Sequence, residues 1–523
     1  MTYNSVYFII YLFVFLVIYF LMPKVWMKQG IILVGNIVFY RLAGGLNYLV
    51  IVIGSSVIVY VISRWIEKIY QNYDNQKEGL SDKAQRTLLE SYKKRCKKIL
   101  VAGLFLILGI LVYIKAGKLL HWEEVTRIVD FRFGLIIVPL GISYYTFSAI
   151  GYIADIYWRK IECEHNYLKL LMCMTFFPII VQGPISRYNA LMKQFDELPK
   201  FKYERLCYGL QLMLWGYFKK IVVADRLALY TSPVLSDLNS YAGIEVALAV
   251  LFSVFFIYAD FSGGIDIVRG IAQAMGVTLE QNFRQPFFSR SVAEFWRRWH
   301  ITLGAWLKDY VYMPLAMSPR FLKLGTNVRR KFGKRAGKIV SYSVPLFIVQ
   351  ILNGLWHGTG ADYLAWGCYW GILSVLSIIF SNELIKLTEM LHINTDTFGY
   401  RLFQTVRTFF LFYIGKMITI TGSLDGFVLL VKRLFSNSRL WVLFDGSIYK
   451  YGLEQKDFNI ALFGILVICV ADIIQQKHSI REIIAGCPLV LRWFIYYVAI
   501  MLVLIVGMWG SSYNVSDFIY GNF

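Results

Sequence analysis

Residues 6–22 read Val6-Tyr-Phe-Ile-Ile-Tyr-Leu-Phe-Val-Phe-Leu-Val-Ile-Tyr-Phe-Leu-Met22 and contain no charged side chain. A helix needs about 20 predominantly apolar residues to cross the hydrocarbon core of a bilayer, and comparable runs recur along the whole chain. The composition agrees, because 57% of the 523 residues are hydrophobic and only 17% are charged. The runs do not alternate as the strands of a membrane barrel do. The sequence therefore predicts an all-α polytopic membrane protein.

The first apolar run has no basic residue before it, which argues against a cleaved signal peptide and for a retained first span. Several later runs are short or interrupted by proline and glycine. Broken helices at membrane depth are tolerated where they are buried in protein or line a wet cavity. We therefore expect about 11–13 spans together with re-entrant pieces. The candidate spans are 6–22, 29–41, 46–66, 99–120, 133–157, 167–183, 206–224, 243–261, 339–355, 363–381, 403–421, 458–475 and 493–510.

The net charge of +21 comes from 54 lysines and arginines against 33 acidic residues. In a soluble protein such a charge would indicate nucleic acid, but here it lies mostly between the apolar runs, where positive charge marks the cytoplasmic side. We therefore expect no nucleic-acid partner, and we expect membrane lipid to contact most of these cations. Segments 67–98 and 318–338 are predicted as basic cytoplasmic loops. The N-terminus and the C-terminal tail 511–523, which has no lysine or arginine, are then predicted outside.

The seven cysteines are scattered and form no Cys-x-x-Cys pair. Neither a structural zinc site nor a disulfide framework is indicated by that spacing. We predict no metal site.

Segment 281–316 alternates aromatic residues with cations, and it contains His300. From Val292 its pattern predicts an amphipathic helix near the cytoplasmic face. Such a helix can simply lie at the interface, with its tryptophans at headgroup level. Alternatively, its arginines bind the phosphates of coenzyme A or of a phosphopantetheine arm. The candidate binding residues of this segment are Trp296, Arg297, Arg298 and Trp299.

His357 lies in an otherwise uncharged apolar stretch, after Trp356 and one helical turn after Asn353. An ionisable side chain at membrane depth is costly and is a functional-site hypothesis by default. An imidazole can take and return a proton near neutral pH, which acyl transfer from a thioester to a hydroxyl requires. The alternative is a buried histidine that only bonds to a neighbouring helix. Asn353 and Trp356 are candidate binding residues beside it.

Asp260 and Asp266 lie at the end of the apolar run 243–261. Two interpretations stay open for Asp260. It either caps a helix at a span boundary or pairs with an arginine of the segment 284–298.

Several segments together resemble the membrane-bound O-acyltransferase (MBOAT) family, in particular its bacterial branch for alginate and peptidoglycan O-acetylation and teichoic-acid D-alanyl transfer. They occur in the family's order and span most of the chain. One departure is Gly264-Ile-Asp where the family often has Tyr-Ser-Asp. The matching segments are Val138-Pro-Leu-Gly-Ile-Ser-Tyr-Tyr-Thr-Phe, Phe177-Pro with Gly183-Pro-Ile-Ser-Arg-Tyr, Gly216-Tyr-Phe-Lys-Lys-Ile-Val-Val-Ala-Asp-Arg-Leu, Tyr258-Ala-Asp-Phe-Ser-Gly, Phe295-Trp-Arg-Arg-Trp-His-Ile-Thr-Leu and Gly354-Leu-Trp-His-Gly.

The resemblance implies an MBOAT-type helical bundle in a bacterial cytoplasmic membrane, with re-entrant and interfacial helices around a central tunnel. It implies that His357 is the catalytic histidine and that His300 is a second active-site histidine. The chain ends in Phe518-Ile-Tyr-Gly-Asn-Phe, which looks like an ending of this branch whose tyrosine is implicated as an acyl carrier. Tyr520 is the matching residue; the alternative is an aromatic tail docked at the interface.

We therefore expect an O-acyltransferase that moves an acyl group across the membrane to a polysaccharide outside. The expected donor is acetyl-CoA, or an acyl carrier thioester, bound from the cytoplasm, and no permanently bound cofactor is expected. A separate extracytoplasmic acetyltransferase or acceptor-handling protein is the expected partner. Two alternatives are D-alanyl transfer from a carrier protein toward teichoic acid, and a transporter or flippase in which His357 only relays protons.

Overall fold

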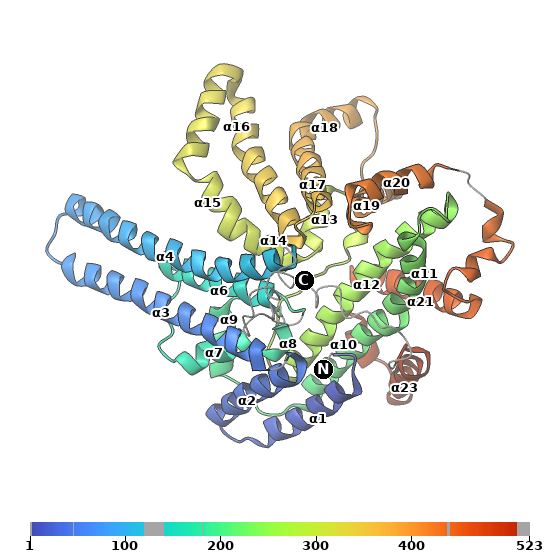
Figure 1. Cartoon of the computed structure of the whole chain (residues 1–523), viewed down its shortest axis with the longest axis horizontal. Coiled ribbons are helices and arrows are strands. Elements are labelled where there is room, and N and C mark those ends of the chain that lie inside the picture. Colours follow the sequence, from blue (N-terminus) through green and yellow to red (C-terminus); the bar gives the residue numbers. More distant parts are fainter. Residues whose placement is uncertain (1–2, 45, 120–140, 181, 437–439, 510–523) are drawn as a thin grey trace, which may run out of the picture. The chain divides into compact units, whose positions relative to one another are not determined.

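The computed structural model describes residues 3–44, 46–119, 141–180, 182–436 and 440–509 (Figure 1). Its regular structure is helical, and no β-strand occurs in these ranges, where one isolated bridge pairs Phe283 with Trp299. The prediction of an all-α protein is confirmed. Tyr520, the tail 511–523 and the first residues of the Val138 motif lie outside the described residues.

Six helices of the described chain are long and apolar enough to cross a membrane. The protein is therefore a multi-pass membrane protein. Six is fewer than the 11–13 expected spans, partly because the structure divides some apolar runs into shorter helices. Run 167–183 holds two, which separate at Phe176. The six candidates are Leu49–Gln76, Ile244–Met275, Pro319–His357, Ala361–Ile379, Gln455–Gln475 and Leu489–Val506.

The chain divides into two compact units, of which the first comprises Met1–Met213 and Val268–Glu280. Its opening helix shows how aromatic residues build the core of this unit. Four buried side chains recur along one face of α1 with helical periodicity, namely Phe8, Leu12, Phe15 and Tyr19,. The helices that begin in this unit are α1 (Val6–Leu21), α2 (Val25–Gly44), α3 (Leu46–Gln76), α4 (Asp82–Leu119), α6 (Ile142–Tyr157), α7 (Tyr167–Thr175), α8 (Phe177–Ile180), α9 (Tyr188–Asp196) and α10 (Tyr203–Tyr217).

The second unit comprises Leu214–Ile267 and the described residues after Gln281. It contains both histidines singled out from the sequence. Its first helices are η1 (Phe218–Ala224, a π-helix), α11 (Asp225–Ser236), α12 (Ile244–Met275), η2 (Pro286–Phe288), α13 (Val292–Arg298), α14 (Ile301–Leu307), η3 (Lys308–Tyr312, a π-helix) and α15 (Met313–Ala316). They are followed by α16 (Pro319–His357), α17 (Ala361–Ile379), α18 (Ser381–Met390), α19 (Phe398–Ile420), α20 (Leu424–Leu434), η4 (Leu440–Leu443), η5 (Ser447–Lys450), α21 (Gln455–Gln475), α22 (Ile480–Ala485) and α23 (Leu489–Val506).

The two segments predicted as basic loops are largely helical. In 67–98, α3 continues to Gln76 and α4 begins at Asp82. In 318–338, α16 turns back on itself at Gly333. Its φ of 89° is a conformation that glycine adopts with little strain,. The two arms of α16 pack closely, because a Cβ on Gly325 would lie 2.0 Å from the Ser341 hydroxyl oxygen. Figure 1 shows the arms side by side.

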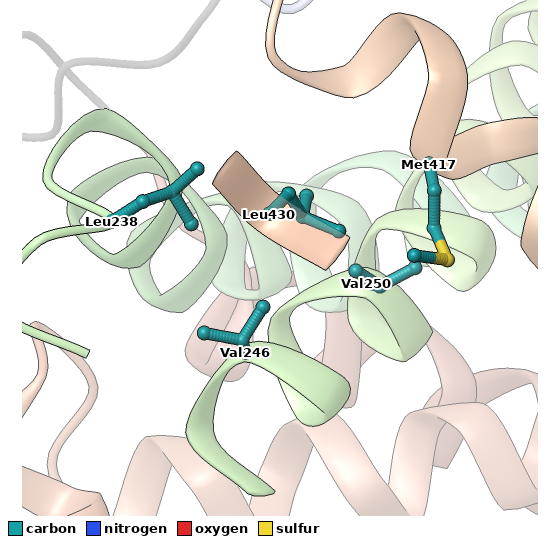
Figure 2. Close-up of a cluster of buried hydrophobic side chains, with 5 residues drawn as sticks. All are labelled: Leu238, Val246, Val250, Met417 and Leu430. Carbon is teal, nitrogen blue, oxygen red and sulfur yellow. The ribbon is translucent and has the colours of Figure 1, made fainter. Parts of the chain in front are cut away.

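A small apolar cluster ties together helices that surround the site region in the second unit (Figure 2). Leu238 comes from the turn after α11, Val250 from α12, Met417 from α19 and Leu430 from α20. Burying such side chains contributes about 1.5–3 kcal/mol each. The cluster therefore packs α19 against α12, and α12 supplies Phe261 to the site described next.

Candidate functional site

His300 lies at a break between two short helices rather than within one amphipathic helix. Its φ of 47° and ψ of 51° are left-handed, an uncommon conformation for a residue other than glycine,. The helix expected from Val292 therefore ends at Arg298, and α14 begins anew at Ile301. Strained backbone of this kind tends to occur at functional sites.

Asn282 holds this break in place. Its side-chain oxygen accepts hydrogen bonds from the backbone N–H of Thr302 at 3.1 Å and from the Thr302 hydroxyl at 2.8 Å. Its backbone oxygen accepts the N–H of Ile301 at 3.0 Å. Asn282 is fully buried, and the sequence analysis did not single it out. The only signal was its place at the start of the aromatic and cationic segment.

The same oxygen of Asn282 lies 3.3 Å from Nδ1 of His300. A backbone N–H can only donate, so the bond from Thr302 identifies this atom of Asn282 as its carbonyl oxygen. Nδ1 of His300 must then carry the hydrogen. Nε2 of the neutral ring is consequently an acceptor.

His300 is buried, and the ring of Phe261 on α12 meets it edge-on at a centroid distance of 4.8 Å. Burial, and to a lesser degree the nearby His357, hold the pKa of His300 well below its ordinary 6.5. An apolar enclosure disfavours the charged ring. His300 is therefore neutral at physiological pH.

His357 is the last residue of α16 and is half-buried. Trp356 lies between the two histidines, because its ring centroid is 4.5 Å from that of His357 and 5.9 Å from that of His300. The ring of Trp366 on α17 meets the ring of His357 edge-on at a centroid distance of 5.3 Å. Residues 57 positions apart in the sequence thus share one aromatic site.

The site is walled by stacked aromatic side chains. Phe295 stacks on Trp299 at 5.6 Å and on Trp370 at 5.8 Å. Trp296 meets Trp366 and Trp370 edge-on at 5.9 and 5.1 Å. These contacts place Trp296 and Trp299, both predicted from the sequence, in the same wall as His300.

Some polar atoms of this wall, of the His300 turn and of Asn353, one helical turn before His357, are buried without a hydrogen-bond partner in the described chain. They are the indole nitrogens of Trp296 and Trp370, the amide nitrogen of Asn282 and the side-chain oxygen of Asn353. Unpaired buried polar groups are rare in native proteins, because each loses its bonds to water. An occupant with both donors and acceptors would satisfy them.

The two predicted arginines differ in their surroundings. Arg298 forms an ion pair with Glu294 at 2.6 Å and donates to the backbone oxygen of Gln285 at 3.3 Å. It closes the turn that carries His300. Arg297 is exposed and remains the arginine of the pair that is open to an anionic ligand.

Asp260 neither caps a helix nor pairs with an arginine of segment 284–298, so both sequence interpretations are wrong. It lies inside α12, fully buried, and Lys220 donates to its Oδ1 at 2.6 Å. Lys219 likewise pairs with Asp266 at 2.6 Å. Both lysines belong to the π-helix η1. Helix propensities do not predict the extra residue that a π-helix holds in its turn. Such π-segments often mark functional sites.

Within the described residues, no three histidine, cysteine or carboxylate side chains come together as metal ligands. Cys96, Cys163 and Cys173 are buried free thiols.

Comparison with known proteins identifies a protein family that this chain matches. The profile of "MBOAT, membrane-bound O-acyltransferase family" matches residues 161–423, about half of the chain. A probable alginate O-acetylase of Pseudomonas syringae pv. tomato is 31% identical over 54% of this chain and 49% of its own length. A peptidoglycan O-acetyltransferase of Helicobacter pylori is 28% identical over 67% and 64%.

A teichoic acid D-alanyltransferase of Bacillus subtilis is 28% identical over 45% of this chain and 57% of its own length. The matched region spans about half the length of the curated alginate O-acetylases. The family segment 161–423 contains His300 and His357 and the whole aromatic wall between them.

Proposed function

The chain belongs to the membrane-bound O-acyltransferase family, and from that premise we propose that it transfers an acyl group across the membrane for the O-acylation of an extracellular or cell-wall polysaccharide. The observation that carries this proposal is the pair His300 and His357, joined through Trp356 in one aromatic site. The proposed acyl group is acetyl, in line with the O-acetylating relatives.

His357 is the proposed general base. It takes the proton of the acceptor hydroxyl while the oxygen attacks the thioester carbonyl, so that a C–O bond forms and the C–S bond breaks. The proton then passes to the departing thiolate, and no net charge is produced. Nε2 of the neutral His300 ring can only accept a hydrogen bond, which leaves oxyanion stabilisation to donors such as the indole N–H of Trp296,.

The proposed donor is acetyl-CoA, or an acyl thioester on a carrier, approaching from the cytoplasm. The unpaired atoms of Trp296, Trp370 and Asn353 suit an arm that carries amide groups. The exposed Arg297 suits a phosphate at the mouth of the site. No permanently bound cofactor takes part in this scheme.

The acyl group is proposed to leave on the outer side of a bacterial cytoplasmic membrane, with both chain termini outside. Tyr520 is the proposed carrier: its phenyl ester stays activated, so a separate extracytoplasmic acetyltransferase can pass the acyl group to the polysaccharide. Replacing Tyr520 with phenylalanine removes only the hydroxyl. Unchanged polymer acetylation in cells with that variant would remove Tyr520 from the mechanism.

D-alanyl transfer toward teichoic acid is the second candidate, favoured by the resemblance to the Bacillus subtilis enzyme. Presenting acetyl and D-alanyl thioesters separately to the protein distinguishes the two. The group that the protein transfers is identified by the mass added to the C-terminal peptide or to the polymer.

The proposal is tested with purified protein and labelled acetyl-CoA. We expect thiol release from wild type and its loss in His357→Ala, because no hydroxyl is activated without the base. His478→Ala is the matched control, since His478 is an exposed histidine at the end of α21. Equal release by wild type and His357→Ala would contradict the proposal and favour a transporter.

A further inference from the structure

One face of α17 covers the site and carries a carboxylate that the proposed mechanism does not use. Asp362, Trp366 and Trp370 follow one another at intervals of four residues, which places them on one side of the helix,. The ring of Trp366 lies 5.3 Å from that of His357, and the ring of Trp370 lies 5.1 Å from that of Trp296. The face that carries Asp362 is therefore the face that lines the site.

The turn of α17 that carries Asp362 lies beside the turn of α16 that carries His357. The helices α16 and α17 are joined by residues 358–360 and pack closely. A Cβ on Gly354 would lie 3.1 Å from the Cα of Gly367, and a Cβ on Gly358 would lie 2.1 Å from the ring of Tyr363. These contacts set the first turn of α17 beside the last turn of α16, where His357 ends the helix.

The Asp362 side chain is 1% exposed, and its Oδ2 accepts no hydrogen bond within the described chain. No ion pair joins it to a cation of the described residues. Its Oδ1 folds over Gly360, where a Cβ would lie only 2.2 Å away. An unpaired buried carboxylate costs several kcal/mol. A positive charge formed on His357, which ends the neighbouring helix α16, would offset that cost.

We propose that Asp362 is a positioning residue for His357, and that its carboxylate stabilises the imidazolium formed when His357 accepts the hydroxyl proton. The proton moves from the acceptor oxygen to the imidazole and then to the thiolate, and it does not pass to Asp362. Its effect on turnover rests on the proposed function, but the pairing of the two side chains does not. Carboxylate partners act in this way on catalytic histidines of unrelated folds.

The competing explanation is a structural one. Asp362 is the second residue of α17, where a negative charge favours the positive end of the helix dipole,. Asp425 occupies the same position in α20 but is exposed and lies outside the aromatic wall. Asp425→Asn therefore measures how much stability a helix loses when such a charge is removed. Asp362→Asn measures that loss together with any effect on His357.

The first experiment compares steady-state turnover of acetyl-CoA by the two variants. Asp362→Asn keeps the shape of the side chain and removes its charge, so we expect kcat to fall about 10²-fold with KM little changed. Asp362→Glu should recover part of the loss, and Asp425→Asn should match wild type. A kcat for Asp362→Asn within about threefold of wild type would overturn the catalytic role.

The second experiment needs no turnover. Diethyl pyrocarbonate modifies only the neutral imidazole, and peptide mass spectrometry follows His357 alone. We expect modification of His357 at about pH 6 to be several times faster in Asp362→Asn than in wild type, and equal at about pH 8. His300, whose pKa is lowered in part by the nearby His357, is the same in both proteins.

The two experiments separate the possible failures. Equal modification rates at both pH values would overturn the pairing of Asp362 with His357, even if His357-dependent thiol release is observed. Faster modification in Asp362→Asn, with no His357-dependent thiol release from wild type, would uphold the pairing and contradict the proposed function.

Discussion

The two histidines of the site are held in opposite ways. His300 is buried in a turn whose hydrogen bonds converge on Asn282, and aromatic rings close around it. His357 ends a helix at a glycine, is half-buried, and follows by one helical turn Asn353, whose side-chain oxygen has no partner in the described chain. The first region is held in one geometry by its hydrogen bonds, whereas the second is less enclosed.

This difference suits the two regions to different functions. A fixed neutral imidazole with Nε2 as acceptor can orient a group without exchanging charge. A less enclosed imidazole beside a carboxylate can take up a proton and return it. Variants of the two regions should therefore fail differently, the first in stability and the second in turnover.

The largest effect is expected at Gly358, where a Cβ would lie 2.1 Å from the ring of Tyr363. Gly358→Ala should push α17 away from His357 and lower kcat by about 10²-fold, because small misplacements of a catalytic group are costly. Gly399→Ala on α19 is the matched control, since its Cβ would meet nothing within 4 Å. Initial rates with labelled acetyl-CoA check both variants. A Gly358→Ala enzyme as active as the Gly399→Ala enzyme would show that the helix spacing is not critical.

Asn282 should matter first for stability. Asn282→Ala leaves the buried N–H and hydroxyl of Thr302 without their acceptor, at a cost of about 2–4 kcal/mol. Asn394, which accepts the N–H of Asp396 on an exposed surface, gives the control Asn394→Ala, with a cost of about 0.5 kcal/mol or less. Thermal unfolding in detergent measures both. Equal melting temperatures for the two variants would mean that Asn282 does not hold the His300 turn.

The stability of the folded protein should depend on pH through the protonation of His300. The pKa of His300 is lower in the folded protein than the ordinary 6.5. Below pH 6.5 the His300 ring therefore binds a proton in the unfolded chain but not in the folded chain. The stability from the neutral ring is thus full above 6.5 and declines by at most about 1.4 kcal/mol per pH unit below it. His300→Asn, which tolerates the left-handed backbone, should lack this decline. Parallel melting curves from pH 5 to 8 for the two proteins would contradict the buried neutral state.

The smallest effect is expected at the mouth of the site. Arg297→Gln should raise KM for acetyl-CoA by about tenfold or less and leave kcat unchanged, because an exposed charge contributes little to binding. Arg320→Gln on the first arm of α16 is an equally exposed control. A drop in kcat at constant KM would instead place Arg297 in the chemistry.

The apolar runs and the ordered motifs were enough to predict a multi-pass helical protein of this family and to single out His300 and His357. Hydrophobicity and motif order are local properties that the sequence displays directly. The tail with Tyr520 and the central tunnel stay predictions.

What the sequence did not predict depends on pairs of residues far apart in the chain. Lys220 and Asp260 meet through a π-helix, and Asn282 meets Thr302 across the break at His300. A continuous amphipathic pattern from Val292 gave no sign of that break, because the break is imposed by tertiary hydrogen bonds rather than by propensity. Asp362 was missed for the same reason, since its isolation is visible only after folding.

The most direct test of a shared His300 and His357 acyl-transfer site is the ester content of the surface polysaccharide in cells that depend on this protein. Cells with His357→Ala, at wild-type protein levels in the membrane, should lose the O-acyl esters that wild-type and His478→Ala cells retain. Full ester content in the His357→Ala cells would contradict the assignment of His357 as the catalytic base.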